Sequence, residues 1–334
     1  MASARKTSSS HGRSRKRGWS ISRRVEKVAT RSRIDLLTLT SMSNAETLDL
    51  LQSAALQAGL DADGARLLRH GSNAIYLLPN AETVARVGRP DTAENASRQM
   101  RIASWLSAND IATNLPIDGV ELVTIDGRPV TWWTPIAAHR HATPAELGAV
   151  LRKLHTVAVP TVLDLPSLDI VGYIVARIDS ATALASTDRR WLRDQLTRLA
   201  KDLAAAEDLQ SRHVVHGDAW QGNLVVPDGG SPILLDFDHV SIGHLAWDLI
   251  PLAVDHEDFA RISSNDYAAF VSAYGGYDVR QAQWFRTLAD LQELRWTAFV
   301  ADKAAHDPTA ADELSHRLAC LQGEVPRPWH WAAF

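Results

Sequence analysis

An aspartate and an asparagine stand five positions apart in the polar segment at residues 216–223, and a second aspartate follows a short apolar run. These residues are Asp218, Asn223 and Asp236. Phosphoryl transfer from a nucleotide needs such a set, because one carboxylate accepts or orients the proton of the attacking hydroxyl. An asparagine and a further aspartate hold the magnesium ion on the phosphates. The Asp-x4-Asn spacing is also that of the kinase catalytic loop.

Two predicted strands bring the magnesium ligands together. Residues 224–226 are Leu-Val-Val and residues 232–235 are Pro-Ile-Leu-Leu, and both runs favour strands. The run Pro-Asp-Gly-Gly between them is a strong turn signal. The sequence therefore predicts a hairpin with Asn223 and Asp236 at its two open ends, where both side chains reach one ion.

Each short motif also has a simpler interpretation. His-Gly-Asp or Asp-Phe-Asp alone is frequent in surface turns. Asp238 is then a turn carboxylate, and His216 is a structural histidine that braces the loop. The motifs together, in this order and flanking a predicted hairpin, favour the catalytic interpretation.

The motifs resemble those of the aminoglycoside phosphotransferase and choline kinase family, whose fold is related to protein kinases. The family pattern is His-Gly-Asp, four residues, Asn, an Asp-Phe/Leu motif and a downstream Asp-Leu, here Asp248-Leu249. The resemblance runs from about residue 60 to the C-terminus. It implies that Asp218 is the catalytic base or hydroxyl orienter and that Asn223 and Asp236 bind magnesium. It also implies that Asp248 supports the catalytic loop by accepting backbone hydrogen bonds.

The resemblance implies a nucleotide site in the first half of the chain. Gly71, Ser72 and Asn73 stand where the family clamps the phosphates, and their backbone N–H groups and the Ser72 hydroxyl are candidate donors. An ordinary hairpin turn is the alternative. The backbone over residues 134–138 is the expected hinge between two lobes and the expected contact of the adenine.

Two positions depart from the family pattern. Arg86 stands where the family has a lysine, so a planar guanidinium replaces a compact ammonium as the phosphate ligand. The helix glutamate that pairs with that lysine corresponds to Gln99, with Glu94 as the other option. An Arg86–Gln99 pair lacks a full ion pair, which leaves open a non-catalytic protein that only binds nucleotide.

The order of predicted elements indicates an α+β fold with two lobes. A helix, three short strands, a helix over 91–108 and a hairpin over 120–133 suit a small β-rich N-lobe at 42–134 that binds nucleotide. Helical patterns dominate the larger C-lobe at 135–334, which carries the catalytic loop and the acceptor site. The expected helices there cover residues 144–157, 188–210, 245–254, 259–274, 281–305 and 309–322. The resemblance implies the same bilobal, protein-kinase-like fold.

Charge is uneven along the 334 residues. Residues 1–41 hold 11 Lys and Arg and two acidic residues, so residues 42–334 carry a net charge of −13. The basic tail lacks apolar periodicity and is expected to be disordered. It is a non-specific contact for nucleic acid or an anionic surface, a transit peptide, or sequence upstream of a true start at Met42, which we favour. No other nucleic-acid contact is expected.

Composition limits the cellular setting. The sequence is 46% hydrophobic but holds no apolar run of about 18 residues, so no membrane partner is expected. The single cysteine, Cys320, forms no internal disulfide and no metal cluster. These features predict a cytoplasmic protein.

The leading hypothesis is a small-molecule kinase that uses ATP, or alternatively GTP, and Mg²⁺ to phosphorylate a hydroxyl. Its acceptor is an aminoglycoside-like or other amine-bearing molecule, or a metabolite such as choline, homoserine or a sugar. Trp220 is a candidate to shape the acceptor pocket. Carboxylates of the helical lobe are candidates to hold an amine, with solvated surface groups as the alternative: Asp255, Glu257, Asp258 and Glu293.

A metal-dependent hydrolase is a competing hypothesis, because this region is rich in residues that ligate metals. The candidate ligands are His213, His216, Asp218, Asp236, Asp238, His239 and His244. The Asp-x4-Asn spacing and the strand-rich first lobe argue against it, since a hydrolase requires neither.

Overall fold

The computed structural model describes residues 43–71 and 73–334. Two sequence predictions lie outside the described residues. They are the basic tail over 1–41, with its alternative start at Met42, and Ser72 as a phosphate ligand. Within the described part of the chain, no helix is long and apolar enough to cross a membrane.

The described chain begins with a helix, α2 (Asn44–Ala58), as the order of predicted elements indicates. Its first turn is a capping box, in which Ser43 Oγ accepts from the Glu46 N–H and the Glu46 carboxylate accepts from the Ser43 N–H. The helix ends at Gly59, whose φ of 71° lies in the left-handed region that favours glycine. Local sequence thus sets both ends of α2.

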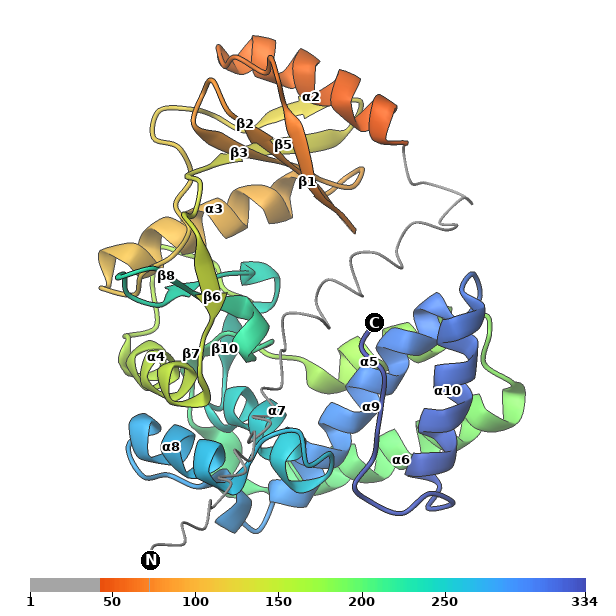
Figure 1. Cartoon of the computed structure of the whole chain (residues 1–334). Helices are drawn as coiled ribbons and strands as arrows, with labels where there is room; N and C mark the ends of the chain where they lie inside the picture. The colour runs from red at the N-terminus through yellow and green to blue at the C-terminus, as the bar shows by residue number, and fades with distance from the viewer. Residues whose placement is uncertain (1–42, 72) are drawn as a thin grey trace, which may run out of the picture. The chain divides into compact units, whose positions relative to one another are not determined.

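A five-stranded antiparallel sheet follows, in the order β1-β2-β3-β5-β4 (Figure 1). Its strands are β1 (Arg66–His70), β2 (Ala74–Leu78), β3 (Thr83–Val87), β4 (Val123–Ile125) and β5 (Arg128–Trp133). Residues of β2 and β3 alternate between buried and half-buried, as the period of two in a strand requires. Tyr76, Leu78 and Ala85 share one hydrophobic core with Leu51 of α2.

A second helix, α3 (Ala93–Ala108), lies on the opposite side of the sheet from α2 (Figure 1). Its Ile102 and Leu106 are fully buried in a different core, which continues into the second half of the chain. Gln99 is the buried polar residue of the same helix. The helix therefore joins the sheet to the elements that carry the catalytic motifs.

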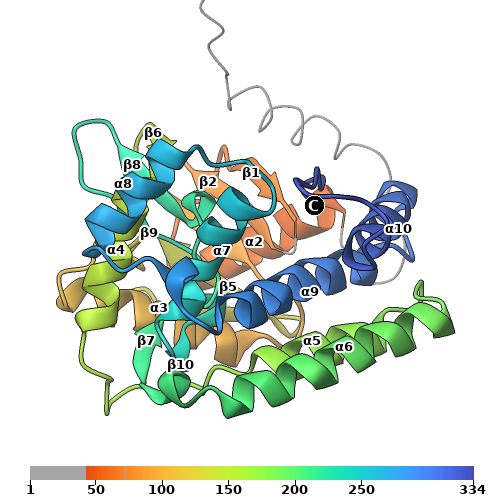
Figure 2. The same ribbon diagram turned by 90° about the horizontal axis from the view of Figure 1, so that it is seen from below.

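The second half of the chain is mostly helical, as expected. Its helices are α4 (Pro144–Thr156), α5 (Ile170–Ser180), α6 (Ser186–Ala205), α7 (Ala246–Glu257), α8 (Ser264–Tyr274), α9 (Phe285–Lys303) and α10 (Pro308–Leu321). The sequence analysis missed α5, whose Ile, Val and Tyr content favours a strand. Its Ile174 and Ile178 are fully buried, and α5 packs beside α9 (Figure 2). Tertiary packing overrides the local propensity here.

Two small sheets and short 3-10 turns carry the motifs between α6 and α7. β6 (His139–His141), β8 (Leu224–Pro227) and β9 (Ile233–Leu234) form one sheet, and β7 (His213–Val215) pairs with β10 (Ser241–Gly243) in the other. The 3-10 turns are η1 (Glu207–Gln210), η2 (Gln221–Asn223), η3 (Phe237–His239) and, after α8, η4 (Val279–Gln281). The predicted hairpin is confirmed as β8–β9, with Leu224 opposite Leu234.

The C-terminal segment packs on the helical half through aromatic and charged side chains. The rings of Trp329 and Trp331 stack with centroids 5.3 Å apart, and both contact Phe259. The Arg327 side chain reaches two buried carboxylates, Asp258 beyond the end of α7 and Glu293 on α9. The end of the chain is therefore bound to Phe259 by rings, and to Asp258 and Glu293 by charge.

Candidate active site

A buried carboxylate on α7 holds the start of the catalytic loop. Asp248 accepts hydrogen bonds from the backbone N–H of His216 at 2.6 Å and of Gly217 at 2.8 Å. Its Oδ2 also lies 3.0 Å from His155 Nε2, and Tyr274 Oη lies 2.8 Å from Nδ1 of that histidine. Burial opposes the charged carboxylate, but the hydrogen bonds and charges of His155 and His216 outweigh it and lower the pKa of Asp248. The expected supporting role of Asp248 is confirmed.

The loop turns at Gly217, where only glycine fits. Its φ is 80°, in the left-handed region. A Cβ at this position would lie 2.3 Å from the carbonyl oxygen of His239. His216 beside it is buried, and its Nε2 lies 2.8 Å from the carbonyl oxygen of Leu235. The backbone of the loop is thus packed against both η3 and the end of β9.

Asp218 projects from this loop and is held by Asn223. The Asn223 amide nitrogen donates to the Asp218 carbonyl oxygen at 2.9 Å and to its carboxylate at 3.3 Å. The Asp218 side chain is 34% exposed, so a substrate hydroxyl has access to it. Because the amide nitrogen of Asn223 is committed to Asp218, its amide oxygen is the atom left to bind a cation.

Asp236 stands at the other open end of the hairpin. The Leu235 N–H donates to the Asn223 carbonyl oxygen at 2.9 Å, which places Asn223 and Asp236 at neighbouring positions of the two chains. Asp236 is exposed and has a φ of 63°, unusual for a residue with a side chain. One amide oxygen and one free carboxylate on adjacent chain ends suit a magnesium ion, which keeps several waters as further ligands.

Arg86 of β3 is bound by three side chains from three elements. Its Nη1 donates to Gln99 Oε1 of α3 at 2.6 Å, and its Nη2 lies 3.5 Å from Asp238 Oδ2 of η3. In the amide orientation that satisfies both groups, the Asn73 oxygen accepts from Arg86 Nη2 at 2.7 Å and Nε at 3.0 Å. Gln99 is therefore the α3 partner of Arg86, whereas Glu94 is exposed.

Asp238 links this cluster to the catalytic half. Its Oδ1 accepts hydrogen bonds from the side-chain amides of Asn95, at 2.9 Å, and Gln99. Arg86 also forms an ion pair with this carboxylate. Three polar side chains, from β3 and α3, thus contact one carboxylate of η3. The turn-carboxylate interpretation of Asp238 is incomplete, because this carboxylate also supplies the charge that the Arg86–Gln99 pair lacks.

Gly71 and Asn73, which the sequence suggests as phosphate ligands, lie just before β2. Among the described residues, Asn73 and Arg86 both line a small cavity of about 40 Å³ beside Gln99 and Asp238. The Gly71 N–H donates to the Asn73 carbonyl oxygen at 3.0 Å and closes the turn. Gly71 therefore shapes the turn with an N–H that is already bonded.

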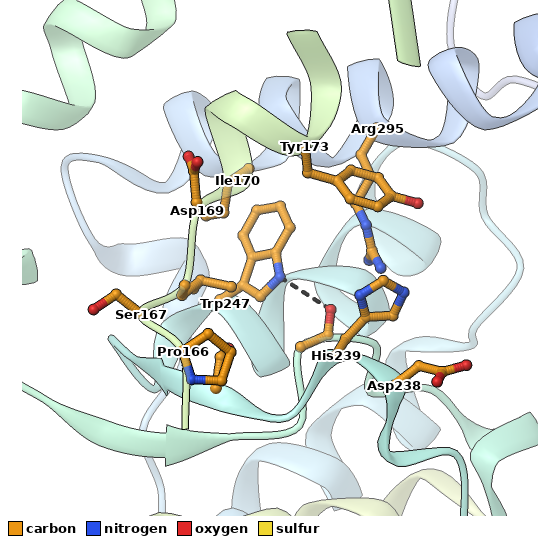
Figure 3. Close-up of a pocket in the computed structure, with 12 residues that line it drawn as sticks. Pro166, Ser167, Asp169, Ile170, Tyr173, Asp238, His239, Trp247 and Arg295 are labelled. Carbon is orange, nitrogen blue, oxygen red and sulfur yellow. Dashed lines mark hydrogen bonds between the residues drawn. The ribbon is translucent and has the colours of Figure 1, made fainter. Parts of the chain in front are cut away.

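A larger cavity, of about 140 Å³, lies beside the catalytic loop (Figure 3). Its walls include Tyr173 of α5, His239 of η3, Trp247 of α7 and Arg295 of α9. The Trp247 indole donates to the Gly217 carbonyl oxygen at 3.2 Å, which fixes this wall to the loop. Trp220, the expected pocket residue, is 52% exposed and is not part of this wall.

Family membership follows from the sequence match. A model described as the phosphotransferase enzyme family matches residues 63–286, more than half of the chain. The chain belongs to this family. The resemblance drawn from Asp218, Asn223, Asp236 and Asp248 is thereby confirmed, and with it the prediction of a small-molecule phosphotransferase. No curated protein matches the sequence.

The fold of this phosphotransferase is similar to solved kinase structures. Amicoumacin kinase hAmiN in complex with AMP-PNP, Ca²⁺ and Ami is 15% identical with a TM-score of 0.65, covering 90% of this chain and 96% of that chain. Choline kinase LicA from Streptococcus pneumoniae is 15% identical with a TM-score of 0.62, covering 83% and 99%. Aminoglycoside phosphotransferase APH(3'')-Id from Streptomyces rimosus is 18% identical with a TM-score of 0.58, covering 76% and 100%. The bilobal, kinase-like α+β fold is confirmed.

Arg295 is a residue of the candidate site that the sequence does not indicate. Its Nη1 lies 3.0 Å from Asp218 Oδ1, although 77 residues separate the two in sequence. Burial and the Arg295 charge lower the pKa of His239 against the nearby carboxylates, so this imidazole is neutral near pH 7. Nothing local to Arg295 distinguishes it from other helix arginines, so only the fold reveals it.

The carboxylates suggested for an amine acceptor are paired with arginines of the phosphotransferase instead. Asp255 binds Arg261, and Glu257 binds Arg280. Asp258 and Glu293 share Arg286 and Arg327, as distances of 2.6 to 3.0 Å show. None of the four carboxylates lines the cavity beside Asp218. Asp258 and Glu293 are buried, and their arginine pairing explains this burial without a ligand.

Proposed function

We propose that the protein transfers the γ-phosphoryl group of ATP, or alternatively GTP, to a hydroxyl of a small molecule in the presence of Mg²⁺. The observation that carries this proposal is the triad of Asp218, Asn223 and Asp236, held by one loop and one hairpin. The AMP-PNP and Ca²⁺ in the hAmiN complex support nucleotide and divalent-cation binding by a related fold.

The proposed chemistry depends on position and charge. Asp218 accepts the proton of the acceptor hydroxyl, and Asn223 orients Asp218 through its amide nitrogen. The acceptor oxygen forms a bond to the γ-phosphorus as the bond to the β-phosphate oxygen breaks, and the bonding electrons leave with the nucleoside diphosphate. A magnesium ion held by Asn223 and Asp236 would neutralise charge on the phosphates. No covalent enzyme intermediate is required.

The nucleotide side of the proposal rests on Arg86. A guanidinium already bound by Gln99, Asp238 and Asn73 has a defined orientation, which favours a phosphate contact over a solvated strand cation. This arrangement also weakens the non-catalytic alternative, since the carboxylate missing from α3 is supplied by Asp238. Residues 42–134 are the proposed nucleotide-binding lobe, and residues 135–334 are the proposed catalytic and acceptor lobe.

The hydrolase alternative loses support from the arrangement of its candidate ligands. Within the described residues, no three His, Cys, Asp or Glu side chains gather as a metal site. His213 Nδ1 lies 3.0 Å from the His155 carbonyl oxygen, and His216 bonds to the Leu235 carbonyl oxygen. The His244 side chain accepts from the Ala246 N–H. These histidines have structural partners.

A paired activity and binding assay tests the proposal. Magnesium-dependent ADP formation by the full chain should rise with one class of hydroxyl acceptor, and EDTA should abolish it. Asp218→Asn should lower turnover by about 100-fold or more while nucleotide binding stays unchanged. Asp228→Asn, an exposed aspartate at the tip of the same hairpin, is the matched control and should keep activity. Retained turnover in Asp218→Asn would refute the proposed base.

A further inference from the structure

Arg295 lines the cavity beside the catalytic loop, and one nitrogen of its guanidinium lacks a hydrogen bond. The Arg295 side chain is only 9% exposed, and its Nη1 has no partner with hydrogen-bond geometry, although it lies 3.0 Å from Asp218 Oδ1. Its guanidinium lies 5.4 Å from the ring centroid of Tyr173 and 6.0 Å from that of Trp247. Figure 3 shows it between the rings of Tyr173 and His239, facing the cavity. The guanidinium is paired with Asp218 and flanked by two rings, and the Nη1 that lacks hydrogen-bond geometry has capacity for an anionic oxygen.

One carboxylate of the same wall is already paired with a cation, and the other caps a helix. Asp238 is bound by Asn95, Gln99 and Arg86. Asp169 caps α5 by accepting from the Gly172 N–H at 2.8 Å. Among the residues that line this cavity, these are the carboxylates, and Arg295 is the arginine or lysine. An ammonium group placed beside Arg295 would meet a like charge, and Asp238 is already paired with Arg86.

The short distance between Arg295 and Asp218 relates the acceptor hydroxyl to the group beside it. A molecule whose hydroxyl reaches Asp218 brings its neighbouring substituent to the guanidinium. Carboxylate and phosphate groups match the planar donors of arginine, and burial strengthens such a charge-assisted contact. The Tyr173 and Trp247 rings and Ile170 offer apolar surface to the rest of the molecule.

We propose that the acceptor is a small hydroxyl-bearing organic anion, whose carboxylate or phosphate group binds Arg295 while its hydroxyl reaches Asp218. This inference rests on the proposed function and names its acceptor class. It differs from an amine-bearing acceptor, for which the candidate carboxylates of the helical lobe are bound to arginines and do not line this cavity.

Matched acceptors in a magnesium–ATP assay with the full chain test this inference. The panel pairs hydroxycarboxylic acids and polyol phosphates with amino alcohols, aminoglycosides and neutral polyols of similar size. We expect ADP formation with one of the anionic groups, and the group that responds distinguishes a carboxylate from a phosphate. Titration calorimetry of the same anions without nucleotide gives a readout independent of turnover.

Substitutions of Arg295 separate anion binding from support of Asp218. Arg295→Gln should raise KM for the anionic acceptor at least tenfold with a smaller change in kcat and should remove the calorimetric signal, whereas Arg295→Lys should restore part of both. Arg198→Gln on exposed α6 is the matched control. Thermal unfolding of each variant checks that it folds.

Three results would overturn the inference. One is ADP formation with amino alcohols or aminoglycosides whose KM is unaffected by Arg295→Gln. Another is a fall in kcat at constant KM for every acceptor, which would limit Arg295 to positioning Asp218. The third is no binding of any anion to the unmodified protein. Absence of both nucleotide binding and transfer with every acceptor would instead refute the proposed function.

Discussion

The guanidinium of Arg86 lies 3.5 Å from the carboxylate of Asp238, across 152 residues of sequence. This pair supplies the opposite charge that Gln99, as a neutral amide, cannot give. The amide of Gln99 instead bridges the two, accepting from Arg86 and donating to Asp238. The counter-ion of Arg86 therefore comes from η3, in the second half of the chain.

Moving a carboxylate back to α3 tests this relationship. Asp238→Asn should raise KM for ATP about tenfold, which corresponds to about 1.4 kcal/mol, because Arg86 loses its counter-ion. In the Asp238→Asn background, Gln99→Glu should lower the KM for ATP again in part. As a single substitution it should destabilise the protein, because its carboxylate would lie beside that of Asp238. Glu94→Gln, exposed on the same helix, is the control. Equal effects of Gln99→Glu in both backgrounds would contradict the shared role.

Removing the charge of Asp248 should loosen the catalytic loop. Asp248→Asn leaves a backbone N–H of His216 or Gly217 facing an amide nitrogen, so we expect a loss of about 2 kcal/mol in unfolding free energy and lower kcat. Because the pKa of Asp248 is lowered, its contribution is present above the pKa of the unfolded chain and is lost as pH falls through the folded pKa.

Denaturant unfolding at neutral and acidic pH measures both effects. The difference between the unmodified protein and Asp248→Asn should shrink in acid. Glu257→Gln, a half-exposed carboxylate on the same helix, should change stability little. A pH-independent difference would argue that packing rather than charge is lost.

Gly217→Ala should impair both stability and activity. The new Cβ would meet the His239 carbonyl oxygen at 2.3 Å with φ at 80°, so we expect a cost of about 2 kcal/mol or more and displacement of Asp218. Gly229→Ala has a similar φ of 70° and nothing within 4 Å, so it should cost only about 1 kcal/mol. Chemical denaturation and measurement of kcat compare the two variants in stability and in activity. Equal costs would mean that φ alone matters.

Glu293 should make stability fall as pH rises. Burial outweighs the attraction of Arg286 and Arg327 and raises the pKa of Glu293 to about 8. A carboxyl with a raised folded pKa costs nothing below its unfolded value near 4.5, and the cost grows until about pH 8. Glu293→Gln should remove this decline. The measurement is the unfolding free energy of the unmodified protein and of Glu293→Gln across that pH range. The same pH dependence in both proteins would contradict the assignment to Glu293.

Local sequence was sufficient for the catalytic loop and its hairpin. Asp218, Asn223 and Asp236 lie within 19 residues. The turn between β8 and β9 contains Pro, Asp and Gly, which favour turns. The ranges of most helices and strands followed for the same reason, since period and caps are local properties. The helix α5 did not, because its β-branched residues favour a strand until α9 buries them.

Long-range pairing explains what the sequence could not reveal. Arg295 and Asp238 acquire their roles only when the fold brings them to Asp218 and Arg86. Arg327 reaches Glu293 from 34 residues away, and this pairing could not be predicted from the sequence either. Ion pairs between different helices and strands produce no periodic pattern in the sequence from which they could be predicted.

The C-terminal segment bears on how the cavity receives its ligand. Arg327 is bound to Glu293, two residues before Arg295 on α9, so the helix is fastened on one side and contributes to the cavity wall from another. A wall held in this way is preorganised, and little conformational entropy is lost when a ligand enters. Discrimination among acceptors should then follow from fit to a fixed shape, with near analogues rejected rather than accommodated.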